Sequence, residues 1–339
     1  MPAPITTTSG RSIAACWQPR FARRAVAAPS LAALRGWLAR ELPQLGDGPV
    51  LRLSPVGGGC IHAAWRLVLA DGRCLFAKTN QLQALPMLQA EADGLRALAQ
   101  AAAAAGSAGP SLTIPAPLAV GVLDGLALLV LPWLELGVRG GSEAWQQLGA
   151  GLARLHRASL PLNQGRGYGF EVDNFIGSGP QANGWLPEWG RFFPERRLAP
   201  QLAWLRRSGV GLQGAEALLE RVPQWLAGHG AKPVLVHGDL WSGNAALLAG
   251  GGGTIFDPAA HWADREVDLA MARLFGGFPG PFFAGYNQEW PLPADAGRRV
   301  ELYNLYHLLN HANLFDGGPG GSYGHQAQSI LQRLLGDLG

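Results

Sequence analysis

Lysine is almost absent from this chain of 339 residues. Only Lys78 and Lys232 among its 27 basic residues are lysine, and the other 25 are arginine. Such a strong avoidance of lysine indicates a coding bias toward arginine and is not itself a functional signal. A lysine that falls inside a motif is therefore more informative here than in an ordinary chain.

The chain also has little charge, few cysteines and no long apolar run. Its net charge is only +3, so the pI of about 9.0 reflects arginine content and does not indicate a nucleic-acid surface. Cys16, Cys60 and Cys74 are too few and too scattered for a disulfide framework or a zinc site, which favours a reducing compartment, the cytoplasm. The longest apolar run, 126–134, contains Pro132 and is much shorter than the ~18 residues of a membrane helix, so no membrane partner is expected.

Acidic residues are missing from the first 40 positions, where several arginines lie among serines and threonines. This composition is similar to that of a transit peptide, but it favours a flexible extension over residues 1–29. The length of the chain suggests about two domains or lobes. We expect an N-terminal lobe over 30–134 and a C-terminal lobe over 135–339.

The segment 30–134 has the pattern of an antiparallel sheet with one main helix. A short helix is expected after Ser30, a good N-cap. Residues 51–80 then predict three strands separated by a glycine-rich turn and by an Asp71-Gly72 hairpin. A helix over 84–105 precedes two more strands around Asp124-Gly125.

Beyond residue 135 the pattern becomes mainly helical. A loop rich in Gly, Asn and Trp is expected over 163–190, and a short hairpin over 245–256. The expected helices cover residues 142–158, 190–207, 213–228, 298–315 and 323–337. Together the two patterns predict an α+β protein of two lobes, with an N-terminal sheet and a larger helical C-terminal lobe.

The strongest chemical signal is the segment VLVHGDLWSGNAALL, residues 234–248, followed by Asp257. An aspartate on a loop with an asparagine five residues later is typical of a phosphoryl-transfer catalytic loop. Asp239 would accept the proton of the attacking hydroxyl, while Asn244 and Asp257 would hold magnesium through hard oxygen ligands. We expect His237 to brace this loop.

A nucleotide site is indicated upstream. Gly57, Gly58 and Gly59 lie between two expected strands, where bare backbone N–H groups can approach phosphate, although such a triplet also suits a plain turn. Lys78 follows on the next strand, where a kinase lysine pairs with the α- and β-phosphates. Glu91 on the following helix is its expected ion-pair partner.

The adenine hinge is expected at the end of the last strand of this lobe, in the sequence VLPWLEL. It comprises Leu131, Pro132, Trp133 and Leu134. Pro132 has no N–H, but its carbonyl can accept a hydrogen bond from the adenine amine, and Leu134 keeps an amide to donate.

The lobes resemble the aminoglycoside-phosphotransferase and choline-kinase branch of the protein-kinase-like fold, in which HGD replaces HRD. More specifically, the chain from about residue 30 to its end resembles a fructosamine (ketosamine-3-) kinase. The segments that carry this resemblance are GGGCIHAAWRL, EADGLRAL, WGRFFPERRLAPQL, LVHGDLWSGN, IFDPAAHWADREVDLAM, LFGGF and LYNLYHLLNHANLF.

The resemblance implies phosphorylation of the 3-hydroxyl of a ketoamine by ATP and Mg²⁺. In this family the product decomposes and frees the amine, which repairs glycated proteins or small amines. The carried-over roles are those of Asp239 as proton acceptor, Asn244 and Asp257 as metal ligands, Lys78 in ATP binding and Glu91 in orienting that lysine.

Three residues are candidate substrate contacts. Trp241 stands where aminoglycoside kinases commonly have His, and its ring suits a sugar or a cationic amine as well as plain packing. Asp264 and Glu266, with Asp268, are expected near the metal site, where they contact the substrate amine, anchor the catalytic loop or form structural ion pairs. His156 and His311 are expected to be structural helix histidines.

Cys60 directly follows the glycine triplet, and amide-rich turns favour thiolate. Oxidation of Cys60 is therefore a candidate redox switch for nucleotide binding, with a small buried residue as the alternative.

Two other functions stay open at this point. A kinase for an aminoglycoside or amino alcohol would use the same fold, but aminoglycoside kinases need several acids for polycationic substrates. From Arg298 onward the chain has only Glu301, Asp316 and Asp337. A non-catalytic binding module is opposed by the complete set of expected catalytic residues. The sequence leaves open the oligomeric state, the preferred ketoamine, and whether that ketoamine is free or protein-bound.

Overall fold

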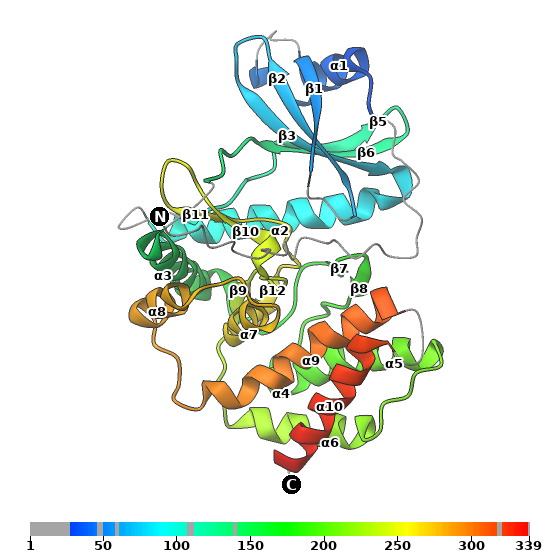
Figure 1. Cartoon of the computed structure of the whole chain (residues 1–339), viewed down its shortest axis with the longest axis vertical. Helices are drawn as coiled ribbons and strands as arrows, with labels where there is room; N and C mark the ends of the chain where they lie inside the picture. The colour runs from blue at the N-terminus through cyan, green and yellow to red at the C-terminus, as the bar shows by residue number, and fades with distance from the viewer. Residues whose placement is uncertain are drawn as a thin grey trace, which may run out of the picture.

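The sheet predicted for the N-terminal lobe is present, and it has five antiparallel strands in the order β1-β2-β3-β6-β5 (Figure 1). The computed structural model describes residues 28–45, 50–57, 61–106, 112–137, 141–316 and 321–337. The strands are β1 (Val50–Val56), β2 (Ala63–Leu69), β3 (Cys74–Gln81), β5 (Ala119–Leu123) and β6 (Leu126–Pro132). The division of the chain at residues 29 and 134 stays a prediction.

Two tight turns set the register of this sheet. Asp124 and Gly125 both have positive φ, 49° and 75°, as a two-residue hairpin that matches strand twist requires. The Asp71-Gly72 turn connects β2 and β3. In the register of these two strands, Lys78 of β3 pairs with Ala64 of β2. On its other side β3 pairs with β6, which places Lys78 opposite Leu129 in the middle of the sheet.

Two helices cover the sheet. Helix α1 (Leu31–Glu41) begins where predicted, with the Ser30 hydroxyl accepting a hydrogen bond from the Ala33 N–H at 3.1 Å. It buries Leu34, Trp37 and Leu38 in the core of the N-terminal lobe. Helix α2 (Leu85–Ala104) runs below the sheet, between the two lobes, and its apolar face joins the core that continues into the C-terminal lobe (Figure 1).

The C-terminal lobe is mainly helical, as predicted. Its helices are α3 (Ser142–Ser159), α4 (Trp189–Phe192), α5 (Ala199–Arg207), α6 (Ala215–Ala227), α7 (Glu266–Leu274), α8 (Gly280–Glu289), α9 (Val300–His311) and α10 (Ser322–Asp337). A π-helical turn over Phe193–Leu198 interrupts the helix predicted for 190–207. No helix among the described ranges is long and apolar enough to cross a membrane.

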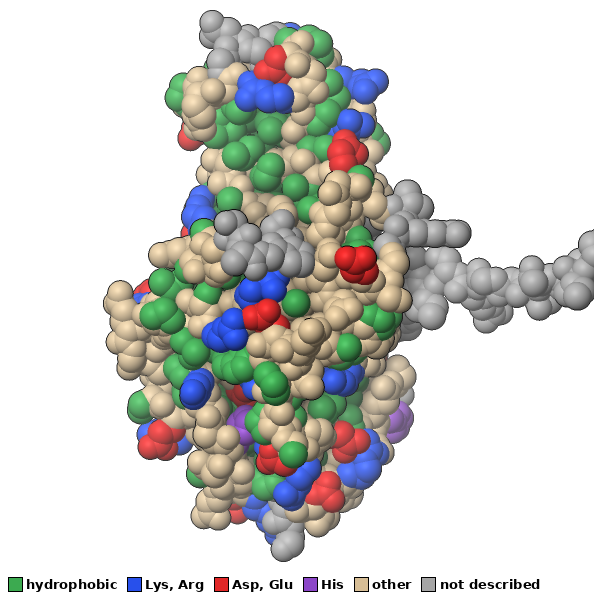
Figure 2. Space-filling view, turned by 90° about the vertical axis from the view of Figure 1, so that its left-hand side faces the viewer, with side chains coloured by type: hydrophobic (Ala, Val, Ile, Leu, Met, Phe, Trp, Pro, Cys, Tyr) green, Lys and Arg blue, Asp and Glu red, His purple; other side chains and the backbone are tan. Residues whose placement is uncertain are grey.

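Short strands hold the connecting loops of this lobe. β9 (Val234–Val236) pairs with β12 (His261–Ala263), and β10 (Ala245–Leu247) pairs with β11 (Gly253–Ile255). β11 also pairs in parallel with β4 (Leu112–Thr113), which precedes β5 in the chain, so the two lobes share this small sheet. On the face shown in Figure 2, cationic and anionic side chains are interspersed.

The prediction that 163–190 is a loop was wrong in part. This segment contains the hairpin of β7 (Asn174–Ile176) and β8 (Gly179–Gln181). Its strands have three residues each and turn Asn174 and Gln181 inward, so they lack the alternation of apolar and polar residues that marks a strand. Helices α7 and α8 were not predicted either.

Candidate active site

Asp239 lies on a loop whose backbone is fixed on both sides. The loop begins at the end of β9 and leads into a 3-10 turn at Ser242–Asn244. Gly238 has a φ of 82°, and a Cβ at this position would overlap the carbonyl of Ala259. Only glycine fits there, which explains the glycine of the HGD motif in physical terms.

Asp268 holds the same loop from the side of α7. Its two carboxylate oxygens accept hydrogen bonds from the backbone N–H groups of His237 and Gly238, both at 2.8 Å. The Nε2 atom of His156 lies 3.2 Å from this carboxylate, and the three partners are fully or almost fully buried. Burial alone would raise the pKa of Asp268, but the hydrogen bond and charge of His156 outweigh it and lower the pKa.

His237 connects the catalytic loop to the segment that leads to Asp257. Its Nε2 lies 2.9 Å from the carbonyl oxygen of Phe256, and its Nδ1 accepts a hydrogen bond from the Asp239 N–H at 3.3 Å. These two contacts require the neutral ring with its proton on Nε2. Burial lowers the pKa of His237 and so favours this neutral form.

Asn244 and Asp257 meet at Asp239, as the motif spacing predicts. The Asn244 Nδ2 donates to the Asp239 carbonyl at 2.9 Å and lies 3.3 Å from the Asp239 carboxylate and 3.4 Å from the Asp257 carbonyl. Within the described ranges, no donor contacts the side-chain amide oxygen of Asn244. Burial, followed by the negative charge of Asp257, raises the pKa of Asp239 to about 7.

Lys78 joins the sheet, helix α2 and the Asp257 loop. Its Nζ lies 2.7 Å from the Glu91 carboxylate and also forms an ion pair with Asp257. Burial alone would lower the pKa of Lys78, but the carboxylates of Asp257 and Glu91 outweigh it and raise the pKa, so the lysine stays charged. The loop that follows Asp257 packs closely against α2 because Gly94, one turn after Glu91, has no side chain. A Cβ at this position would lie only 3.1 Å from the Ala260 Cβ.

The hinge segment follows directly from β6. Leu131 and Pro132 are still paired with β3, and Trp133 and Leu134 lie beyond the strand. The Trp133 Nε1 donates to Glu135 at 2.7 Å, and the Arg66 guanidinium lies 4.7 Å from the centre of the Trp133 ring. These contacts tie the side chain of Trp133, in the predicted hinge, to Arg66 on β2.

The glycine-rich turn is only partly described. Gly57 follows β1, and a Cβ built on it would meet no atom within 4 Å. The predictions for Gly58, Gly59 and Cys60 fall outside the described residues.

His62, two residues beyond Cys60, was not predicted as a site residue. Its Nδ1 lies 2.9 Å from the Asn80 Nδ2, and burial together with the charge of Lys78 lowers its pKa to about 4. Its place in the GGGCIH segment is the signal by which the sequence could have indicated it.

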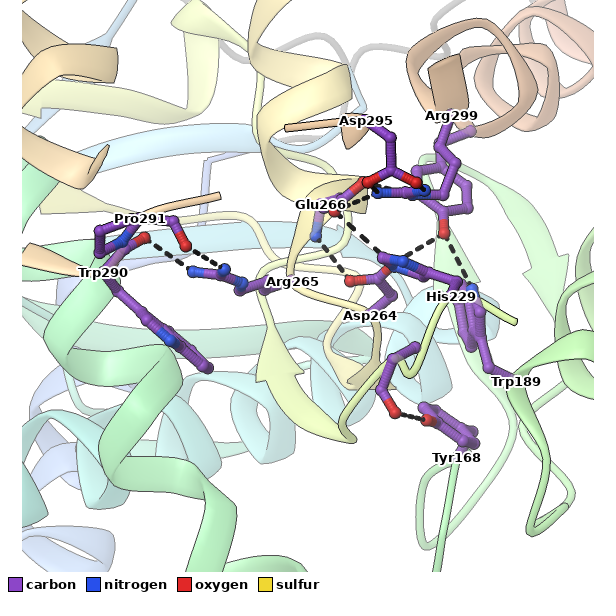
Figure 3. A network of polar contacts seen from close by, with 12 residues as sticks. Tyr168, Trp189, His229, Asp264, Arg265, Glu266, Trp290, Pro291, Asp295 and Arg299 are labelled. Carbon is purple, nitrogen blue, oxygen red and sulfur yellow. Dashed lines mark hydrogen bonds and ion pairs between the residues drawn. The ribbon is translucent and has the colours of Figure 1, made fainter. Parts of the chain in front are cut away.

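Asp264 and Glu266 already have protein partners (Figure 3). The Asp264 carboxylate accepts from the Tyr303 hydroxyl at 2.6 Å and lies 2.6 Å from the His229 Nε2. Glu266 forms two hydrogen bonds with the buried Arg299, at 2.8 and 3.0 Å. Atoms of His229, Asp264 and Glu266 are close enough to one another to hold a metal ion, but the Glu266 carboxylate is already paired with Arg299. The arrangement favours the structural ion pairs over a substrate contact.

Trp241 is half-buried beside Asp239. Gly243 allows its ring to fold back over the turn, since a Cβ at this position would overlap the ring. A role for Trp241 in substrate binding stays a prediction.

The chain is similar to known kinases along most of its length. The fructosamine kinase family model matches residues 44–337. A protein from Synechocystis assigned as a probable ketoamine kinase is 43% identical over 300 residues, which cover 88% of this chain and 96% of that protein. The chloroplastic protein-ribulosamine 3-kinase of Oryza sativa is 35% identical over 288 residues, 84% of this chain and 78% of that protein.

Solved structures agree on the fold. The crystal structure of a protein from Haemophilus somnus assigned as a fructosamine-3-kinase matches with a TM-score of 0.77 and 26% identity, over 89% of this chain and 96% of that one. An aminoglycoside phosphotransferase bound to ADP and hygromycin B matches with a TM-score of 0.57 and 17% identity, over 89% and 98%, and supports the fold alone. The protein therefore belongs to the fructosamine kinase family and is a kinase, an enzyme that transfers phosphate from ATP to a hydroxyl group.

Proposed function

We propose that this kinase phosphorylates the 3-hydroxyl of ketoamines, with Asp239 as the catalytic base and Mg²⁺ as the metal cofactor. The observation that carries this proposal is the convergence of Asp239, Asn244, Asp257 and the Lys78–Glu91 pair from four separate segments. The relatives named ketoamine kinase and protein-ribulosamine 3-kinase support ketoamines as the substrate class.

Asp239 has the environment that a base for a hydroxyl needs. Its pKa of about 7 lies near the expected working pH, where the carboxylate form that accepts a proton is well populated and is more basic than an ordinary aspartate. The Asn244 amide donates to its backbone and side chain, which orients the carboxylate. In the proposed reaction the substrate hydroxyl gives its proton to Asp239 as its oxygen attacks the γ-phosphorus of ATP, and ADP leaves.

The donors beside Asp239 fit magnesium, which prefers hard oxygen ligands and usually takes only one or two carboxylates. The amide oxygen of Asn244 and the carboxylate of Asp257 would hold the ion. When bound, Mg²⁺ neutralises negative charge on the phosphates of ATP. Lys78 would exchange part of its contact with Asp257 for the α- and β-phosphates and keep Glu91 as its partner.

Aminoglycoside and amino-alcohol kinases remain the second candidate because the aminoglycoside phosphotransferase shares the fold. The engagement of Asp264 and Glu266 by Arg299, His229 and Tyr303 leaves fewer acids for a polycation, which favours the ketoamine. The proposal also includes a cytoplasmic location. It covers both free and protein-bound ketoamines as substrates.

The proposal is tested with a panel of acceptors at equal concentration: fructosamines, ribulosamines and erythrulosamines, free and on a glycated peptide, beside free sugars, aminoglycosides and choline. We expect ATP-dependent phosphorylation of the ketoamines and none with Asp239→Ala. Turnover of an aminoglycoside or choline without turnover of ketoamines would move the assignment to the second candidate.

A further inference from the structure

The β7–β8 hairpin directs two buried amide side chains at the loop that carries Asp257. Asn174 Nδ2 donates to the carbonyl of Ala260 at 2.8 Å, and Gln181 Nε2 donates to the carbonyl of Ala259 at 3.1 Å. Both side chains are almost completely buried, with residue exposures of 4% and 2%. Ala259 and Ala260 are buried, so their carbonyls rely on protein donors. The Ala259 carbonyl also lies 2.9 Å from the His261 Nδ1, so the contact of Asn174 with Ala260 is the stronger tie between hairpin and loop.

The amides of the hairpin are themselves held by further partners. The Asn174 Oδ1 accepts from Gln181 at 2.8 Å and from Asn183 at 2.7 Å. The Gln181 Oε1 accepts from the Tyr306 hydroxyl of α9 at 2.7 Å, and the Asn183 Oδ1 accepts from the buried Arg197 at 2.7 Å. This network, which we call the hairpin network (Asn174, Gln181, Asn183, Arg197 and Tyr306), leaves neither amide free to rotate.

The same loop also binds the catalytic loop. The Ala259 N–H donates to the His237 carbonyl at 2.9 Å, and the Ala259 carbonyl lies against Gly238. Residues 259 and 260 therefore lie between the hairpin network and the loop of Asp239. A shift of this backbone changes the position of Asp257 relative to Asp239.

Asp257 needs such external support. Its φ of 58° lies in the left-handed region, which is uncommon for residues other than glycine. Strained backbone of this kind persists only where the surrounding structure holds it. The hairpin network binds the backbone at Ala259 and Ala260, two and three residues after Asp257.

We propose that the hairpin network is a positioning device for the metal-binding loop, in which Asn174 and Gln181 hold Asp257 at the geometry that binds divalent metal beside Asp239. The proposal rests on the proposed function insofar as Asp257 is the metal ligand. It predicts that weakening the network lowers metal affinity and loosens the loop, although no member of the network is among the predicted metal or nucleotide ligands.

The test uses the full-length protein with Asn174→Asp, which keeps the acceptor oxygen and removes the N–H₂ donor to Ala260. The matched control is Asn163→Asp, since the buried Asn163 also donates to a backbone carbonyl, that of Gly167 at 2.9 Å, and accepts from the Gly167 N–H. Tyr306→Phe is a milder second variant, because it removes only the hydroxyl that holds Gln181.

Two readouts do not require turnover. The first is the affinity for Mn²⁺ in the presence of ADP, which is measured from the decrease of the EPR signal of the free ion. The second is hydrogen exchange of the Ala259 amide in the metal-free protein. We expect Asn174→Asp to weaken Mn²⁺ binding about 10- to 100-fold, as loss of a supporting contact to a metal ligand typically does. We also expect faster exchange at Ala259, and the same changes to a smaller extent in Tyr306→Phe.

The proposal is overturned if Asn174→Asp binds Mn²⁺ as the wild type does, or if Asn163→Asp weakens binding equally. If Asn174→Asp does not fold, Tyr306→Phe decides by the same two readouts. A wild-type protein that binds Mn²⁺ and ADP but phosphorylates no ketoamine would contradict the proposed function and leave this test intact.

Discussion

The ammonium of Lys78 on β3 lies 2.7 Å from the carboxylate of Glu91 on α2, and less than a tenth of the Lys78 side chain is exposed. The ion pair holds the ammonium of Lys78, the lysine that the kinase motif requires, between the sheet and helix α2. Arginine is no equivalent there, because its planar fork differs from a compact ammonium that contacts two carboxylates.

Glu91→Gln is expected to lower kcat/KM for ATP about 10- to 100-fold, or roughly 1.4–2.8 kcal/mol of transition-state stabilisation. The amide leaves the Asp257 carboxylate as the charged partner of Lys78, so the ammonium is no longer held in place by Glu91 for the phosphates. Steady-state kinetics with ATP as the varied substrate measures the effect. Asp93→Asn on the same helix is the control, because its ion pair with Arg96 is half-exposed and weak. Equal kinetics for both variants would contradict the role of Glu91.

Asp239→Asn should stabilise the protein while it lowers kcat about 100- to 10,000-fold. The pKa of Asp239 is raised in the folded state to about 7, from 3.8. The folded state is therefore favoured by the protonated carboxyl at low pH and loses that stability as the pH rises through about 7. The gain from Asn should be larger at pH 8, on the order of 1–4 kcal/mol, than at pH 5.

Denaturant unfolding of the metal-free protein at the two pH values measures this difference. A gain that is the same at pH 5 and pH 8 would show that the Asp239 carboxyl is not destabilised by its surroundings.

Asp268→Asn is expected to destabilise the fold and to lower kcat, because the catalytic loop loses hydrogen bonds to a buried charge. Such bonds contribute roughly 1.5–3 kcal/mol each. Asp316→Asn is the matched control, since the Asp316 carboxylate also accepts two backbone N–H groups, those of Tyr323 and Gly324. Unfolding free energies and kcat are compared for the two variants. A control that loses as much kcat as Asp268→Asn would refute the specific effect on the loop.

His229→Gln should destabilise the protein more at pH 6 than at pH 9. Burial alone would lower the pKa of His229, but the hydrogen bond and charge of Asp264, with Glu266, outweigh it and raise the pKa. The stability that comes from this ion pair is complete below the unfolded value of 6.5 and is lost as the pH rises through the higher folded pKa. Thermal unfolding at the two pH values checks the sign, and a loss that grows toward pH 9 would contradict it.

The loop that holds Asp239 and Asn244 together at the candidate site could be predicted from the sequence because the spacing of these two residues is local. The separation between Asp239 and Asn244 is a property of one loop, and the turns at Asp71-Gly72 and Asp124-Gly125 set the strands around Lys78 by short-range geometry. The resemblance to fructosamine kinases then gave the fold class and family, and both are confirmed.

The residues that support the site could not be predicted in this way. Asn174 and Gln181 have the composition of a loop, and their hydrogen bonds reach partners 86 and 78 residues away. The partners of Asp264 and Glu266 lie on three different segments, at His229, Arg299 and Tyr303. Only the packing of the whole lobe brings such groups together, so a local sequence pattern cannot predict these contacts.

The central claim is transfer of phosphate from ATP to the 3-hydroxyl of a ketoamine with Asp239 as the base. It is tested most directly by phosphorus–proton correlation NMR of the product that forms from ATP and a fructosamine-bearing lysine peptide. We predict a phosphorus signal coupled to the proton on C3 of the sugar with the wild type, and no product on the same timescale with Asp239→Asn. Phosphate on another hydroxyl, or undiminished product formation by Asp239→Asn, would contradict the account.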